Sequence, residues 1–177
     1  VGTILSRKIT LPEDQYQVIN DNINNYVKLD VQTDKCPYYL GKMVKNVKMN
    51  ESPDFMKKRL SSVGMRSINI LVDISNYVML EYGQPMHFFD QEVMGSNVLV
   101  RDAYDDELIT TLDKQERVLN HNDIVITDGT KAQCIAGVMG GLNSEITENT
   151  KNIFIESAIF NAVSIRNTAS RLNLKSE

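Results

Sequence analysis

The stretch "NVLVRDAYDDELITTLDKQERVLNHNDIVITDGTKAQCIAGV", residues 97–138, decides the fold class. Its apolar residues gather in short runs that alternate with polar residues, which is the pattern of half-buried β-strands. The runs are separated by "YDDE", "DKQE" and "DGTK", whose composition favours tight turns. The segment therefore predicts a succession of short strands, and "NIFIESAIF", residues 152–160, predicts another.

Helical patterns lie on both sides of these strands. "ESPDFMKKRLSSVGM", residues 51–65, predicts a helix with Ser52 as N-cap and Pro53 in the first turn. "NILVDISNYVMLEY", residues 69–82, predicts a second helix, and its broad apolar set indicates that most of it is buried. A last helix is expected over residues 161–174. The order of these elements, with helices first, short strands next and a helix last, predicts an α+β fold. We expect a layered β-sandwich-like core with flanking helices.

The composition is that of an ordinary globular protein, with 42% hydrophobic and 24% charged residues. The net charge of −4 excludes a surface that binds nucleic acid by charge alone. Cys36 and Cys134 lie far apart and show no metal-ligand spacing, so we expect no metal site and a cytoplasmic protein. No apolar run approaches the length that spans a membrane.

The two ends of the chain suggest how it is organised. Residues 1–35 are polar and weakly patterned, and we expect a loose arm there with a short helix after Pro12. The chain begins without methionine and stops at Leu-Lys-Ser-Glu, which indicates a piece of a longer protein. We therefore expect an arm from a preceding region, residues 1–35, and a domain over residues 36–177 that is truncated at its C-terminus.

His87 is the first candidate for chemistry. It lies in "ISNYVMLEYGQPMHFFD", residues 74–90, after a Pro85 that forces a turn, so we expect it in a loop. A ring with a pKa near ~6.5 suits proton transfer or the orientation of water, although taken alone the residue is better explained as a partly buried histidine bonded to a backbone carbonyl. Ser75 and Asn76, on a mostly buried helix, need polar partners and are placed to reach the same space.

Glu156 is the most informative polar residue. Strand alternation places it on the same face as Phe154 and Phe160. A carboxylate among aromatic rings must be paired, protonated or turned to a cavity that holds a polar ligand. The glycines of "AGVMGG", residues 136–141, allow close backbone approach or positive φ, which a plain turn also explains. The order of these glycines is not that of a phosphate-binding loop.

The order of these segments resembles the central module of the bacterial phenylalanyl-tRNA synthetase beta subunits. That family reads roughly Arg-Pro-Ile-Asn, Val-Asp-Ile-Thr-Asn-Tyr-Val-Met and Gly-Gln-Pro-Met/Leu-His-Ala-Phe-Asp. The chain matches these blocks at residues 66–69, 72–79 and 83–90. "IAGVMGG", "IFIESAIF" and "IRNTASRLNL" follow in the family's order. The resemblance covers residues 36–177 and is specific because several long blocks match at once.

The resemblance implies an editing domain, in which a positioned water hydrolyses tyrosine misattached to the phenylalanine tRNA. Such a site is needed because a pocket shaped for phenylalanine rejects the same ring with a hydroxyl by only about 10²-fold. Glu156 is then the group that accepts the tyrosine hydroxyl, and the glycines leave room for the ring. The implied roles are catalysis by His87 and Asn76, and substrate binding by Glu156, Gly137, Gly140, Ser75 and Ser176.

The chain departs from the family pattern at several of these positions. Ser75 stands in place of a threonine, Phe88 in place of an alanine and Ser67 in place of a proline. After Leu174 the family continues Thr-Asp-Ala-Ser, and we expect Ser176 to stand for that threonine.

The implied partners are the 3′ end of the phenylalanine tRNA, tyrosine or phenylalanine, the synthetase alpha subunit and the other beta-subunit domains. No cofactor is implied for this domain, because ATP and Mg are used elsewhere in the parent enzyme, and no membrane is implied. Two other interpretations stay open. One is a non-catalytic module that positions the tRNA end and assists subunit assembly, and the other is a free-standing relative that deacylates aminoacyl-tRNA.

Overall fold

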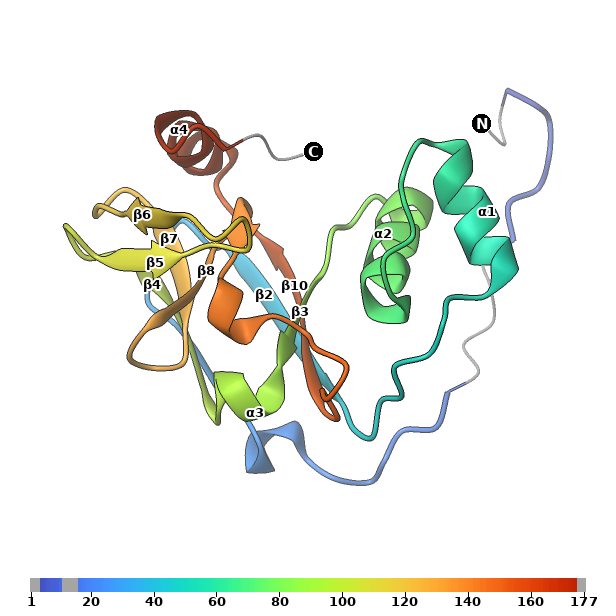
Figure 1. The fold of residues 1–177 in the computed structure, drawn as a ribbon, viewed down its shortest axis with the longest axis horizontal. Helices are drawn as coiled ribbons and strands as arrows, with labels where there is room; N and C mark the ends of the chain where they lie inside the picture. Colours follow the sequence, from blue (N-terminus) through green and yellow to red (C-terminus); the bar gives the residue numbers. More distant parts are fainter. Residues whose placement is uncertain (1–3, 11–15, 175–177) are drawn as a thin grey trace.

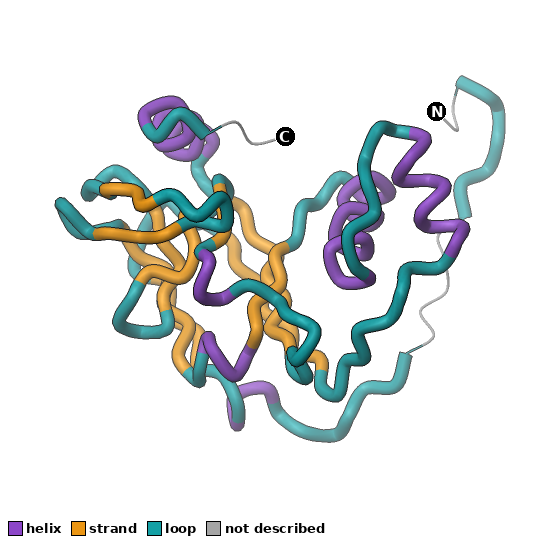
Figure 2. Tube along the Cα trace, viewed as in Figure 1, coloured by secondary structure: helices purple, strands orange, loops and turns teal. Residues whose placement is uncertain are grey.

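The computed structural model describes residues 4–10 and 16–174, which form three layers (Figures 1 and 2). Helix α2, with α1 packed on it, covers one face of a three-stranded sheet, and the other face packs on a five-stranded sheet. The predicted α+β class with a sandwich-like core is therefore confirmed. The elements are η1 (Ile23–Asn25), β1 (Lys28–Val31), β2 (Tyr38–Val44), α1 (Asp54–Ser62), α2 (Ile70–Tyr82), β3 (His87–Asp90), α3 (Gln91–Met94), β4 (Asn97–Asp102), β5 (Leu108–Thr110), β6 (Glu116–Val118), β7 (Ile124–Thr127), β8 (Ala132–Ile135), β9 (Met139–Gly140), η2 (Leu142–Ser144), β10 (Ile153–Ile159) and α4 (Ala162–Arg171).

The five-stranded sheet has the strand order β1-β4-β7-β8-β9, and the short strands predicted over residues 97–138 form most of it. Its inner face contributes Val98, Ile126 and Cys134 to the core between the sheets. The outer face carries Val125 and Ile135, which pack against the β5–β6 hairpin and the residues that end α4. Both faces of β7 and β8 are therefore covered by apolar layers, and nearly all residues of these two strands are buried instead of every second one.

Strand β1 differs from the sequence-based expectation. Residues 28–31 were expected in a loose arm, but they pair in parallel with β4, from Lys28 opposite Asn97 to Val31 opposite Val100. All four residues of β1 are exposed, so no hydrophobic alternation marks the strand in the sequence. The residues after Pro12, where a short helix was expected, fall largely outside the described residues.

The three-stranded sheet has the order β2-β10-β3, with both pairings antiparallel. On one face, Phe89 and Phe154 lie opposite each other and join the core shared with the five-stranded sheet. On the other face, Phe88 and Ile153 pack with Leu71 of α2. Residue 87, expected in a loop, begins strand β3 instead, because the chain after Pro85 pairs its backbone with β10.

Two details of α1 and α2 correct the sequence analysis. Pro53 is the N-cap residue of α1 and makes no side-chain cap, while the Ser52 hydroxyl donates to buried Asp73 instead. Helix α2 is less buried than expected, since only Leu71 and Asp73 are fully buried, most other residues are half-buried, and its last three residues, 80–82, are exposed. The broad apolar set is therefore divided between contacts with the sheet and contacts with α1. No described helix has the length and apolar character needed to cross a membrane.

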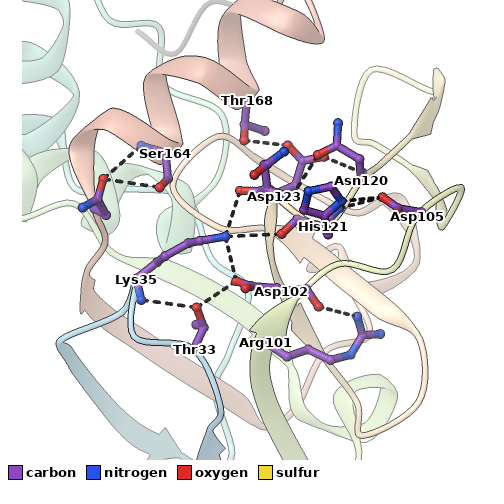
Figure 3. Close-up of polar contacts among 12 residues, drawn as sticks. Thr33, Lys35, Arg101, Asp102, Asp105, Asn120, His121, Asp123, Ser164 and Thr168 are labelled. Carbon is purple, nitrogen blue, oxygen red and sulfur yellow. Dashed lines mark hydrogen bonds and ion pairs between the residues drawn. The ribbon is translucent and has the colours of Figure 1, made fainter.

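Helix α4 is held against the β-layers by polar contacts (Figure 3). Asn161 caps the helix as predicted, accepting the N–H groups of Val163 and Ser164. The Thr168 hydroxyl donates to buried Asp123 at 2.7 Å, just before β7. These contacts fix the end of β10, which leads into α4, relative to the five-stranded sheet.

Candidate functional site

A cavity of about 400 Å³ lies between α2, the start of β3 and the segment that follows β9. Its apolar wall includes Val72 and Leu112, and its polar groups come from Ser75, Asn76, His87 and Glu145. Three of the residues predicted from the sequence, Ser75, Asn76 and His87, therefore share one space. Two lie on α2 and one on β3, and the turn between these elements brings them together.

The two α2 residues behave differently within this cavity. The Ser75 hydroxyl donates to the Met86 carbonyl at 2.6 Å, which ties the helix to the residue just before β3. The Asn76 amide makes no hydrogen bond to any residue that the structure describes, and it lines the cavity. Ser75 thus helps to fix the geometry of the wall, whereas the Asn76 amide is available to a ligand.

His87 packs tightly within the protein although its ring also borders the cavity. Its ring lies edge-to-face against Phe89, with centroids 4.5 Å apart. It also lies over Gly140, where a Cβ atom would come within 2.8 Å of the ring carbon Cε1. Burial lowers the pKa of His87 to about 4 because the imidazolium loses its hydration. The ring is therefore neutral at pH 7 and offers one donor and one acceptor nitrogen.

Glu156 lies directly opposite His87 in the β10–β3 ladder, so both side chains lie on the face between the sheets. Its side chain is buried, and the Tyr39 hydroxyl donates to its Oε2 atom at 3.2 Å. Burial raises the pKa of Glu156 to about 8, and the Tyr39 hydrogen bond opposes that rise only in part. At pH 7 this buried carboxyl group, beside the cavity histidine, is therefore mostly protonated.

The remaining predicted residues that the structure describes do not line the cavity. Gly140 contacts the His87 ring, so its missing side chain makes room for that ring. Gly137 has φ of +65°, and a Cβ atom there would meet Ile165 of α4 at 3.2 Å. Glu156 also lies outside the lining, behind His87. Ser176 falls outside the described residues.

A family model described as "B3/4 domain" matches residues 35–177. The chain belongs to the B3/4 domain family. The resemblance to phenylalanyl-tRNA synthetase beta subunits that the motifs indicated is confirmed by curated relatives. The phenylalanine–tRNA ligase beta subunit of Staphylococcus saprophyticus is 54% identical over 171 residues, covering 96% of this chain and 21% of that protein. That of Staphylococcus haemolyticus is 48% identical over 179 residues, covering 100% of this chain and 22% of that protein.

The chain spans about one fifth of the length of these relatives. Among solved structures, an N-terminal fragment of the phenylalanyl-tRNA synthetase beta-subunit from Pyrococcus horikoshii has a TM-score of 0.59 at 14% sequence identity. The match covers 92% of this chain and 52% of that one, and at this identity it shows the fold alone. The layered arrangement of this B3/4 domain is therefore shared with a distant protein.

Two residues of the B3/4 domain site escaped the sequence analysis. Glu145 lines the cavity, but nothing in "NSEIT" distinguishes its carboxylate from a solvated one. Tyr39 is the hydrogen-bond donor to Glu156. The sequence could have indicated it, because a buried carboxylate needs a donor and the burial of β2 alternates along the strand. No group of His, Cys, Asp and Glu in the described part of the chain is arranged to hold a metal ion.

Proposed function

We propose that this B3/4 domain is the editing site of a phenylalanine–tRNA ligase beta subunit, where tyrosine misattached to the phenylalanine tRNA is hydrolysed. The observation that carries the proposal is the placement of three groups. His87 and Asn76 border one cavity, and Glu156 lies directly behind His87 in the β10–β3 ladder. The curated relatives are named as beta subunits of this ligase, which supports the phenylalanine tRNA as part of the substrate.

The chemistry required is the attack of water on an aminoacyl ester. The water adds to the ester carbonyl, the tetrahedral intermediate collapses, and tyrosine and the free 3′ hydroxyl of the tRNA are released. A neutral His87 orients that water through its acceptor nitrogen, and the Asn76 amide donates to the carbonyl oxygen as negative charge develops. The vicinal ribose hydroxyl of the tRNA is the other group able to orient the water. No protein nucleophile is required.

Two carboxyl groups recognise different parts of the amino acid. Glu145 borders the cavity and attracts the α-ammonium group of the aminoacyl ester. Glu156 accepts the hydroxyl of the tyrosine ring, which phenylalanine lacks. The ring reaches Glu156 when the His87 side chain swings off Gly140, because the missing side chain at that position leaves space for one ring. Phenylalanine leaves the buried carboxyl group without that partner, which lowers its affinity for the same space.

The proposal also assigns partners. The 3′ end of the phenylalanine tRNA enters the cavity, and the alpha subunit and the remaining beta-subunit domains hold the rest of the tRNA in the cytoplasm. The net charge of −4 fits this division, because the domain itself has little general attraction for RNA. ATP and Mg act elsewhere in such a ligase, and the editing reaction needs neither.

The test is deacylation of Tyr-tRNA(Phe) and Phe-tRNA(Phe) by the full ligase and by two variants. Glu156→Ala is expected to lose the preference for tyrosine, and His87→Ala to slow hydrolysis by about 10²-fold, the usual contribution of such a group. His121→Ala is the matched control, since the second histidine is exposed and bonded to Asp105 (Figure 3), and it does not line the cavity.

Wild-type rates in both active-site variants would contradict the assignment of the site. Tyr-tRNA(Phe) that binds to the domain without being hydrolysed would instead favour the non-catalytic interpretation, in which the domain positions the tRNA end. Hydrolysis by this chain alone, at the rate of the full ligase, would favour a free-standing deacylase.

A further inference from the structure

The Glu156 carboxyl group has one hydrogen-bond donor among the described residues. That donor is the hydroxyl of Tyr39 on β2, 3.2 Å from Oε2. The other ionisable groups around it are Cys36 ahead of β2, Cys134 on β8 and His87 on β3. Burial raises the thiol pKa of both cysteines and lowers the pKa of His87, so these three groups are uncharged at pH 7. None of them neutralises an ionised Glu156.

The register of the three-stranded sheet explains why Tyr39 reaches this carboxyl. The residue directly opposite Glu156 on β2 is Gly41, which has no side chain to interpose. Tyr39 lies opposite Ala158, two positions along, and a long aromatic side chain spans the diagonal of an antiparallel pair. A Cβ atom at position 41 would come within 2.5 Å of the Phe154 ring, so that position is closed to larger residues.

We propose that Tyr39 is a positioning residue, which aims the Glu156 carboxyl group and thereby sets the discrimination between tyrosine and phenylalanine. This inference rests on the proposed editing function. A carboxyl group has two oxygens with several acceptor sites. Tyr39 occupies Oε2 and fixes the rotation of the group, which leaves Oε1 to accept the second phenol, that of the substrate. Both donors are phenols, so the geometry that suits one suits the other.

The hydrogen bond has a second effect on the same carboxyl. A donor to Oε2 favours the ionised form, and the Tyr39 bond lowers the pKa of Glu156 against the larger effect of burial. An ionised carboxylate accepts a phenol hydrogen more strongly than a protonated one. Tyr39 therefore keeps a larger fraction of Glu156 in the form that separates the two amino acids near neutral pH.

The experiment compares Tyr39→Phe with Tyr38→Phe in the full ligase. Tyr38 is the neighbouring phenol on the opposite face of β2 and is 56% exposed, so its variant is a matched control. Deacylation of Tyr-tRNA(Phe) and Phe-tRNA(Phe) is measured as a function of pH. We expect Tyr39→Phe to lower the ratio of the two rates about tenfold, as the loss of one hydrogen bond to a charged group implies. The pH at which the ratio reaches its maximum moves upward, and Tyr38→Phe changes neither.

Three outcomes are decisive. A smaller ratio with an upward pH shift supports the positioning role. An equal loss of rate on both substrates with no pH shift means that Tyr39 is merely structural and overturns the inference. If the wild-type ligase hydrolyses neither substrate, the proposed function fails and the inference with it. Failure of the function can be told apart from failure of the Tyr39–Glu156 contact by difference infrared spectra, with Glu156→Gln as reference. These spectra report whether Tyr39→Phe raises the pH at which Glu156 loses its proton, even in a ligase that hydrolyses neither substrate.

Discussion

At the scale of the single residue, the buried carboxyl of Glu156 lowers the free energy of unfolding, although the proposed function needs it. In the unfolded chain its carboxyl ionises near its ordinary pKa of 4.5, but burial raises the folded-state pKa to about 8. Between these values the unfolded state releases a proton that the folded state keeps. The free energy of unfolding therefore falls as pH rises from about 4.5 to about 8. In the proposed function, the site keeps this group, which lowers stability, because the group recognises a hydroxyl.

This linkage predicts that Glu156→Gln is more stable than the wild type above neutral pH. Glutamine keeps the size and an oxygen that accepts from Tyr39, but it never ionises. We expect a gain on the order of a few kcal/mol at pH 8 that vanishes below about pH 4.5, because each pKa unit corresponds to about 1.4 kcal/mol. Urea unfolding across this pH range measures it. A difference that is independent of pH would show that the carboxyl is not protonated in the folded protein.

Asp73 stabilises the fold at the scale of the secondary structure elements. It is fully buried in the first turn of α2 and accepts the hydroxyls of Ser52 and Ser67 and the N–H of Ile68. Burial by itself raises the pKa of this carboxyl, but the three donors outweigh it and hold the pKa below its ordinary value. The chain on either side of α1 is thereby fastened to α2.

We predict that Asp73→Asn lowers the free energy of unfolding by about 1–3 kcal/mol, because the amide places a donor against three donors. The contribution of a carboxyl with a lowered pKa is present above its unfolded pKa and is lost as pH falls through the folded value. The deficit of the variant is therefore expected at pH 7 and should shrink below about pH 4. Asp54→Asn, on the exposed first turn of α1, is the control. Equal stability of the wild type and Asp73→Asn at pH 7 would refute this role.

The same scale shows what the sequence alone could predict. Strands β4, β7 and β8 were predictable because each is a short run rich in β-branched and other apolar residues, bounded by turn sequences. Strand β1 was not, since all four of its residues are exposed and its pairing with β4 is non-local. His87 was placed in a loop for a related reason, because only the distant β10 makes its segment a strand. The sequence singled out His87, Asn76 and Glu156 as candidates. It could not show that His87 and Asn76 border a cavity while Glu156 lies in the core behind them, because the fold decides this.

At the scale of the whole molecule, the balance of charge bears on how the domain would bind the proposed tRNA substrate. The chain has 19 basic and 23 acidic residues, and Glu145 is placed at the cavity itself. Proteins that bind RNA through several phosphate contacts lose affinity steeply with salt because counterions are released from the RNA. In the proposed function, a domain with net charge −4 that receives only the tRNA end should release few of these counterions.

We therefore predict that kcat/KM of this chain for Tyr-tRNA(Phe) changes by no more than about threefold between 50 and 200 mM salt, as expected for at most one phosphate contact. The full ligase, whose other parts would hold the body of the tRNA, should lose far more over the same range. Parallel salt titrations of both proteins on one tRNA preparation measure the difference. A slope for the isolated chain as steep as that of the ligase would mean that the domain grips the phosphate backbone itself. The tRNA would then be held beside the cavity by a local cluster of lysines and arginines, despite the acidic balance of the chain as a whole.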